Sequence, residues 1–214
     1  MSSENHDFAS HPRIFCIGRN YAKHIAELGD ADAEQCVIFM KPTSCLVPVG
    51  TAVHLPRDQG AVHHEAELVV QIGRAGSNIA EENACEHIQA LTLGLDLTLR
   101  DLQNTLKAQS APWERSKAFE HSAPLGEWRA YQPNMDLADL DFTCHINAEL
   151  RQHGHTRDML FPVPRLISLL SNTWALRPGD MIFTGTPEGV GPLNPGESVV
   201  LKSPALGTFS WELV

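Results

Sequence analysis

The sequence is short of positive charge. It has 16 Lys and Arg residues against 26 Asp and Glu residues, which gives a formal net charge of -10 at pH 7 and a pI near 5.5. Nucleic acid and anionic membranes attract basic surfaces, so neither is an expected partner. An anionic substrate would need Arg, Lys or a metal ion placed locally at its binding site.

Close cysteine pairs and long apolar runs are also missing. The five cysteines are odd in number, and no two have the CxxC spacing of a zinc site or a redox motif. Buried, reduced thiols in a cytosolic protein are the expected interpretation. No segment approaches the ~18 apolar residues of a membrane span, and the stretch MSSENHDFASHPRIF lacks the cationic and apolar regions of a signal peptide. We therefore expect a cytoplasmic protein.

Short apolar segments separated by proline and glycine turns make up most of the chain. We expect a flexible tail over 1–12 and a single domain over 13–214, because 214 residues suffice for one sizeable core. The patterns predict strands over 14–17, 37–41, 53–55, 64–72, 91–98, 141–147 and 181–184, a hairpin partner near Leu150 and two closing strands after Glu197. They predict helices over 21–28, 81–89, 101–107 and 164–174, the first capped by Asn20 and Gly29. Many short strands with a few helices indicate a mainly β, mixed fold rather than regular βαβ winding.

Acidic residues interrupt two of the apolar segments. In HHEAELVVQIG, Glu65 and Glu67 point the same way because strand side chains alternate. In LTLGLDLTL, Asp96 lies on the polar face of a leucine-rich strand. Carboxylates this close repel unless a cation lies between them, and three of them suit a hard divalent ion such as Mg²⁺ or Mn²⁺. His63 shares the face of Glu65 and is expected to assist by hydrogen bonding; solvated residues on an exposed sheet face are the alternative.

A second candidate pair lies in GRNYAKHIAELG. His24 and Glu27 are three residues apart, so on a helix they share a face. A carboxylate beside an imidazole orients the ring and raises its basicity, which suits a base that activates water. An ordinary exposed pair is the alternative.

Groups for an anionic substrate follow later in the chain. Arg100 and Gln103 share a helix face, and Lys117 lies among aromatic residues in WERSKAF, although a solvated lysine is the default. The loop TGTPEGVG, residues 184–191, supplies hydroxyl and backbone N–H groups. It lacks the GK[ST] ending of a phosphate loop, which disfavours nucleotide binding, and a plain turn is the alternative.

Together and in this order, the motifs resemble the fumarylacetoacetate hydrolase family. The resemblance is to its small single-domain branch of acylpyruvate hydrolases, oxaloacetate decarboxylases and 2-hydroxyhepta-2,4-diene-1,7-dioate isomerases. It extends from Arg13 to the end of the chain through IGRNYAKHIAELG, FMKPTSCLV, VHHEAELVVQIG, GLDLTLRDLQ, PWERSKAFEHSAPLG, TRDMLFPVPRLISLLS and LRPGDMIFTGTPEGVGPL. It implies the mixed β-sandwich roll of that family's C-terminal domain, usually assembled as a homodimer.

The resemblance also implies roles for individual residues. The metal ligands would be Glu65, Glu67 and Asp96, with Mg²⁺ as the cofactor and Mn²⁺ or Ca²⁺ as alternatives. The catalytic residues would be Lys117 and a His24–Glu27 dyad on a short lid helix. The residues that bind substrate would be Arg19, Arg100, Gln103 and Thr186.

The sequence departs from the family around the lysine. The family often reads AKGFD there, whereas this chain has Ala118 in place of the glycine and Glu120 in place of the aspartate. Both differences could alter the shape of the pocket, but neither removes a ligand.

The function implied is hydrolysis of a C–C bond in an acylpyruvate or other 2,4-dioxo acid, a small anionic 2-oxo acid, with pyruvate leaving as its enolate. Decarboxylation of oxaloacetate, which needs no water, and isomerisation of a 2-hydroxy-dienoate are alternatives on the same site. A catalytically silent binding module is less favoured because all the matched ligands are present. A serine hydrolase built on Ser116 is disfavoured because Ser116 and Lys117 would point opposite ways in an extended segment.

Overall fold

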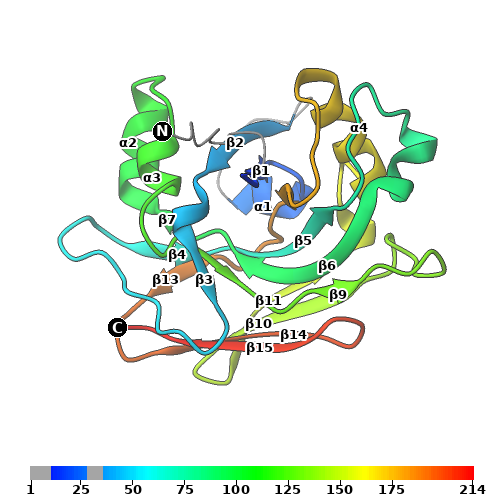
Figure 1. Ribbon diagram of the computed structural model, residues 1–214. Helices are drawn as coiled ribbons and strands as arrows, with labels where there is room; N and C mark the ends of the chain where they lie inside the picture. The colour runs from blue at the N-terminus through cyan, green and yellow to red at the C-terminus, as the bar shows by residue number, and fades with distance from the viewer. Residues whose placement is uncertain (1–10, 28–35) are drawn as a thin grey trace, which may run out of the picture.

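The computed structural model describes residues 11–27 and 36–214, whose strands form three β-sheets (Figure 1). The predicted mainly β, mixed fold is confirmed. Most of the predicted tail over 1–12, and Gly29, lie outside the described residues. No helix in the described part of the chain is long and apolar enough to cross a membrane.

The largest sheet has the strand order β2-β1-β12-β5-β6-β8-β3, with β9 also paired to β6. It is mixed, since β1–β12 and β3–β8 are parallel and the other pairs are antiparallel. Its strands are β1 (Ile14–Gly18), β2 (Val37–Lys41), β3 (Leu46–Pro48), β5 (Ala66–Ile72), β6 (Ile88–Leu95), β8 (Ala123–Leu125), β9 (Arg129–Ala130) and β12 (Met181–Phe183).

A four-stranded antiparallel sheet lies beneath the large one in Figure 1. Its order is β11-β10-β14-β15, formed by β10 (Asp141–Ile146), β11 (Glu149–His155), β14 (Ser198–Ser203) and β15 (Gly207–Glu212). The third sheet, of order β13-β4-β7, is formed by β4 (Val62–His64), β7 (Thr98–Leu99) and β13 (Gly191–Leu193).

Short helices lie around these sheets. The α-helices are α1 (Ala22–Glu27), α2 (Arg100–Ala108), α3 (Glu114–Lys117) and α4 (Val163–Thr173), and the 3-10 helices are η2 (Thr43–Cys45), η3 (Glu81–His87) and η4 (Thr156–Asp158). Helices α2 and α3 lie together on one side of the molecule, with α4 on the other (Figure 1). The buried face of α2 carries Arg100, Gln103 and Leu106 at helical spacing, so two of its three buried residues are polar.

Both faces of β5 are buried, which explains its run of apolar residues. Leu68 and Val70 join the core shared with the four-stranded sheet, which includes Phe142, Leu201 and Trp211. On the opposite face Val69 joins a second cluster with Ile14, Cys16, Phe39 and Phe183. Because side chains alternate, Glu67 shares the face of Val69, so this second cluster forms the floor on which the carboxylates lie.

One glycine is required in the centre of the large sheet. A Cβ at Gly94 would lie 2.8 Å from the Phe183 ring and 3.0 Å from Val69. Gly94 is the partner of Glu67 across the β5–β6 pair. Its lack of a side chain therefore lets the second cluster pack tightly next to Glu67.

Several predicted elements differ from the structure. The predicted helix over 81–89 is the 3-10 helix η3, which ends at His87 because Ile88 pairs with β5. The predicted strand over 53–55 is wrong as a full strand, since Val53 makes only an isolated bridge to Leu213. The predicted strands over 64–72 and 91–98 are each interrupted, at Glu65 and after Leu95, where the chain passes from the large sheet to the three-stranded one.

Candidate active site

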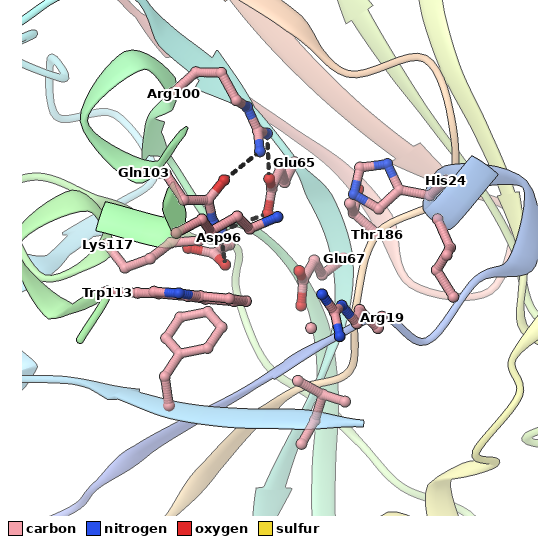
Figure 2. A pocket seen from close by; sticks show the side chains of 15 residues that line it. Arg19, His24, Glu65, Glu67, Asp96, Arg100, Gln103, Trp113, Lys117 and Thr186 are labelled. Carbon is pink, nitrogen blue, oxygen red and sulfur yellow. Dashed lines mark hydrogen bonds and ion pairs between the residues drawn. The ribbon is translucent and has the colours of Figure 1, made fainter. Parts of the chain in front are cut away.

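A cleft with about 450 Å³ of empty space opens where these strands change sheets. Every predicted site residue except Glu27 and His63 lines it, and Glu27 bonds to one that does. Figure 2 shows Arg100 reaching Glu65, and Lys117 reaching Glu65 and Asp96, with Gln103 beside Arg100 and with His24 and Thr186 across the pocket. His63 is not among the lining residues, and its assisting role stays a prediction.

The sheet-to-sheet crossing positions the three carboxylates. Glu65 lies between β4 and β5, and Asp96 lies between β6 and β7. The Asp96 N–H donates to the Glu65 carbonyl at 2.8 Å, which joins the two crossings. Oxygen atoms from Glu65, Glu67 and Asp96 lie within 4.8 Å of one another, and all three side chains are buried.

Buried cations hold two of these carboxylates. The Lys117 ammonium lies 2.7 Å from both Glu65 Oε2 and Asp96 Oδ2, and Arg100 Nη2 lies 2.5 Å from Glu65 Oε1. Arg100 also donates to Gln103 at 2.6 Å. Burial would raise the pKa of Glu65, but Lys117 and Arg100 hold that pKa well below its ordinary value. Burial would lower the pKa of Lys117, but the carboxylates of Asp96 and Glu65 raise it to about 12.

Glu67 has no such ion pair among the described contacts. Its Oε2 accepts the Gly185 N–H at 2.8 Å. Burial, followed by the neighbouring charges of Asp96 and Glu65, raises the pKa of Glu67 well above its ordinary value. Glu65 is therefore held in its ionised form. Glu67, in contrast, needs a further positive charge nearby before it ionises.

The carboxylates fit a divalent metal ion. Asp96 Oδ1 is buried and accepts no hydrogen bond from the described residues, although an ion partner, Lys41 Nζ, lies 2.9 Å away. A cluster of three buried carboxylates, offering oxygen ligands only, is what a hard cation such as Mg²⁺ or Mn²⁺ binds.

The candidate water-activating pair sits on α1. His24 Nδ1 lies 3.1 Å from Glu27 Oε2, and Glu27 Oε1 accepts the Gly189 N–H at 3.0 Å. Because the carboxylate is an acceptor, Nδ1 carries the ring hydrogen and Nε2 is left to accept a proton. The helix is thus held over the cleft by the 184–191 loop.

Asn20 anchors the start of this lid differently from the prediction. Its side chain donates to the carbonyls of Phe161 and Thr184 at 3.1 and 2.7 Å and accepts the Phe161 N–H at 2.7 Å. The predicted N-cap role is therefore wrong, because the amide group bridges distant segments. Arg19, just before it, lines the cleft with a positive φ of 63°.

Gln152 positions Thr186 from the four-stranded sheet. Its amide nitrogen donates to Thr186 Oγ1 at 2.8 Å, and its oxygen accepts the Ala66 N–H at 3.0 Å. Thr186 in turn donates to the Ala66 carbonyl at 2.8 Å. The hydroxyl hydrogen is thus committed, so the Thr186 side chain offers a ligand an acceptor.

One end of the cleft is aromatic and basic. The rings of Phe39 and Trp113 lie 6.4 Å apart at 53°, and Lys107 Nζ lies 5.1 Å from the Trp113 ring. All three residues line the cleft. This end could contact the part of a substrate that lies beyond the carboxylates.

Comparisons with known proteins identify the chain. The family model described as "Fumarylacetoacetate (FAA) hydrolase C-terminal" matches residues 13–214. The chain belongs to the fumarylacetoacetate hydrolase family. The predicted resemblance is thereby confirmed.

Individual family members are similar over most of the chain. Oxaloacetate tautomerase YcgM of Escherichia coli is 40% identical over 190 residues, 88% of this chain and 87% of the relative. The mitochondrial oxaloacetate decarboxylase of Dictyostelium discoideum is 38% identical over 188 residues, 87% of this chain and 86% of the relative. The crystal structure of fumarylpyruvate hydrolase from Pseudomonas aeruginosa, in complex with Mn²⁺ and pyruvate, has a TM-score of 0.90 at 37% identity, covering 95% of this chain and 90% of that one. The prediction of a metal-dependent enzyme of the fumarylacetoacetate hydrolase family is confirmed.

One residue next to the site, Lys41, was missed in the sequence analysis, and the conformation of the segment at Ser116 was misjudged. Lys41 was missed because a lysine that ends an apolar strand, VIFMK, is normally exposed. Its spacing of two from Phe39 was the available signal that both face the same side. The segment at Ser116 is helical, not extended, and Ser116 Oγ donates to the Trp113 carbonyl at 2.7 Å, so the serine serves the local turn.

Proposed function

We propose that this chain is a divalent-metal-dependent hydrolase that cleaves a C–C bond in acylpyruvates and related 2,4-dioxo acids. The observation that carries the proposal is the His24–Glu27 pair, oriented at 3.1 Å and lining the same cleft as the three carboxylates. Hydrolysis needs a base that deprotonates water, whereas decarboxylation needs none, so the oriented pair favours hydrolysis over decarboxylation.

The charges of the cleft support an anionic substrate. Three carboxylates face three buried cations, Lys41, Arg100 and Lys117, so these groups alone are close to neutral. A divalent ion held by Glu65, Glu67 and Asp96 would make the site positive. We propose Mg²⁺ as that ion, with Mn²⁺ or Ca²⁺ as alternatives, and a small 2-oxo acid as the substrate.

The chain's own residues divide the chemistry between them. His24 Nε2 takes a proton from water while Glu27 holds the Nδ1 hydrogen and stabilises the imidazolium. The water oxygen bonds to the distal acyl carbon, the C–C bond breaks, and its electron pair leaves with the pyruvate portion. Lys117 and Arg100 offset the negative charge on that portion, while Arg19, Gln103 and Thr186 contact the substrate. A divalent cation held by Glu65, Glu67 and Asp96 would supply further positive charge as a Lewis acid.

The test is to follow the ultraviolet absorbance of acetylpyruvate with purified protein and Mg²⁺, with and without EDTA. Release of pyruvate and acetate that EDTA abolishes is the expected result. No turnover by protein that binds Mg²⁺ would contradict the hydrolase proposal.

Oxaloacetate is the second candidate substrate. The relatives named for oxaloacetate, at 38% and 40% identity, support it, and decarboxylation could use the same carboxylates and cations without His24. Isomerisation of 2-hydroxyhepta-2,4-diene-1,7-dioate stays a further alternative on this site. Release of CO₂ from oxaloacetate, measured beside the acetylpyruvate assay, would rank the activities.

We further propose that residues 13–214 act as one catalytic domain, as a homodimer in the cytoplasm. All five cysteines are free thiols, which suits a reducing compartment. Light scattering of the purified protein tests the dimer, and fluorescence imaging of the tagged chain in its native cell tests the compartment.

A further inference from the structure

A buried lysine outside the proposed chemistry lies against the site. Lys41 is the last residue of β2, and its side chain is 0% exposed. Lysine is almost never fully buried unless its charge is paired. The mechanism above assigns Lys41 no contact with substrate, and it does not line the cleft. The burial of Lys41 must therefore be explained by a role other than substrate binding.

Every polar contact of the Lys41 ammonium is with a segment that carries a site residue. It donates to the Leu97 carbonyl at 3.2 Å and to the Lys117 carbonyl, and it lies 2.9 Å from Asp96 Oδ1. One side chain thus joins the end of β2 to two segments that lie 56 and 76 residues further along the chain.

Both carbonyls lie where regular backbone bonding ends. Leu97 lies between β6 and β7, after the chain has left the large sheet. Lys117 is the last residue of α3, and carbonyls at a helix end lack partners within the helix. Ser122 Oγ also donates to the Lys117 carbonyl, at 2.8 Å. Lys41 therefore supplies N–H donors to two carbonyls, of Leu97 and Lys117, that lie outside regular strand and helix bonding.

We propose that Lys41 is a positioning residue, which fixes the Asp96 carboxylate and the Lys117 backbone so that the carboxylate site is ready for a divalent ion. This inference rests on the proposed metal site. It assigns to Lys41 neither a metal ligand nor a contact with substrate.

A simpler role for Lys41, as a counter-charge alone, makes the opposite prediction. If it only neutralises Asp96, its removal leaves the site more negative, and a divalent cation binds more tightly. If it positions Asp96 and Lys117, its removal loosens the ligand set, and the ion binds more weakly. Residues that orient metal ligands typically contribute about 10–100-fold to metal affinity. The direction of the change separates the two roles.

The experiment measures Mn²⁺ binding to metal-stripped wild-type protein and to the Lys41→Met variant, by calorimetry and by electron paramagnetic resonance of the bound ion. Methionine keeps the length of the side chain and removes the N–H groups and the charge. We expect Mn²⁺ to bind about 10–100-fold more weakly, with an altered spectrum. Unchanged or tighter binding would overturn the proposal.

A matched variant separates positioning from general stability. Leu201→Ala removes a fully buried side chain from β14 in the four-stranded sheet, away from the cleft. We expect it to lower the melting temperature while the Mn²⁺ affinity stays at the wild-type value. An equal loss of affinity in Leu201→Ala would attribute the effect of Lys41→Met to stability and would overturn the proposal.

Wild-type protein provides the remaining checks. A wild type that binds no Mn²⁺ would overturn the proposed metal site and this inference together. Normal wild-type binding with an unaffected Lys41→Met variant would overturn the inference alone.

If Lys41→Met does not fold, a crystal structure of the Mn²⁺-loaded wild type tests the proposal instead. We expect Lys41 to keep its bonds to Leu97 and Lys117; displacement of Lys41 by the metal would overturn the proposal.

Discussion

The Asp96 N–H donates to the Glu65 carbonyl at 2.8 Å, at the point where the two paired strands leave the large sheet. On either side of this bond, Ala66 pairs with Leu95 in one sheet and His63 with Thr98 in another. The bond keeps the two strands together through the change of sheet. It therefore holds the carboxylates of Glu65 and Asp96 side by side at a point where neither sheet continues its ladder of hydrogen bonds.

The His24→Ala variant tests the water-activating base. We expect hydrolysis of acetylpyruvate to fall about 10²–10⁴-fold, because that is the usual contribution of a general base. Mn²⁺ affinity should stay at the wild-type value, since His24 is not one of the carboxylates. Steady-state rates and calorimetry measure the two effects.

Lys23→Ala is the matched control on the same helix. Lys23 is exposed and pairs with Glu188 at 3.4 Å, a surface contact worth little. Its activity should be close to that of the wild type. An equal loss in both variants would mean that the lid helix, rather than the imidazole, had been disturbed, and unchanged turnover in His24→Ala would remove the base from the mechanism.

The sequence predicts those features of the site that depend on neighbouring residues. It does not predict those that depend on contacts with distant parts of the chain. Strand alternation predicts that Glu65 and Glu67 share a face, and helix periodicity predicts that Arg100 and Gln103 do. Both are local regularities. The break of the strand at Glu65 is not local, because it depends on which sheet each half joins. The burial of Lys41 likewise depends on acceptors far along the chain.

Glu67 predicts how the stability of the metal-free protein varies with pH. Burial, then Asp96 and Glu65, raises its pKa in the folded state above the ordinary 4.5. The native state then binds more protons than the unfolded state between those two pKa values, so stability falls as pH rises through this interval. We expect Glu67→Gln, which cannot ionise, to lack this part of the decline.

Urea unfolding in EDTA from pH 5 to pH 8 measures the difference between the two proteins. Comparing them removes the opposing contribution of His63, whose pKa is lowered to about 4 by burial and by Arg100. Parallel stability profiles for wild type and Glu67→Gln would contradict the prediction. In the wild type, Mn²⁺ affinity should rise with pH, because the ion binds the ionised carboxylate.

Gly185→Ala tests why the residue whose N–H donates to Glu67 is a glycine. Gly185 has a φ of +98°, and an added Cβ would lie 2.7 Å from the Cβ of Asn20. Gly196 has a similar φ of +88° with nothing within 4 Å of an added Cβ, so Gly196→Ala carries the backbone strain without the collision. We expect Gly185→Ala to lose about 1–3 kcal/mol more stability than Gly196→Ala, the usual cost of overpacking. Equal losses in urea unfolding would show that φ alone sets the requirement for glycine.

Lys107 predicts which 2,4-dioxo acids the enzyme prefers. It lines the aromatic end of the cleft, with its ammonium 5.1 Å from the Trp113 ring. A second carboxylate at the far end of a substrate, as in fumarylpyruvate, would lie near its ammonium, whereas acetylpyruvate ends in a methyl group. Lys107→Met should raise the KM for fumarylpyruvate about three- to fivefold, in line with ~1 kcal/mol for a partly exposed charge pair. The KM for acetylpyruvate should change little, and Lys107→Arg should keep the preference. An equal rise for both substrates would show that Lys107 acts through the shape of the cleft rather than through its charge.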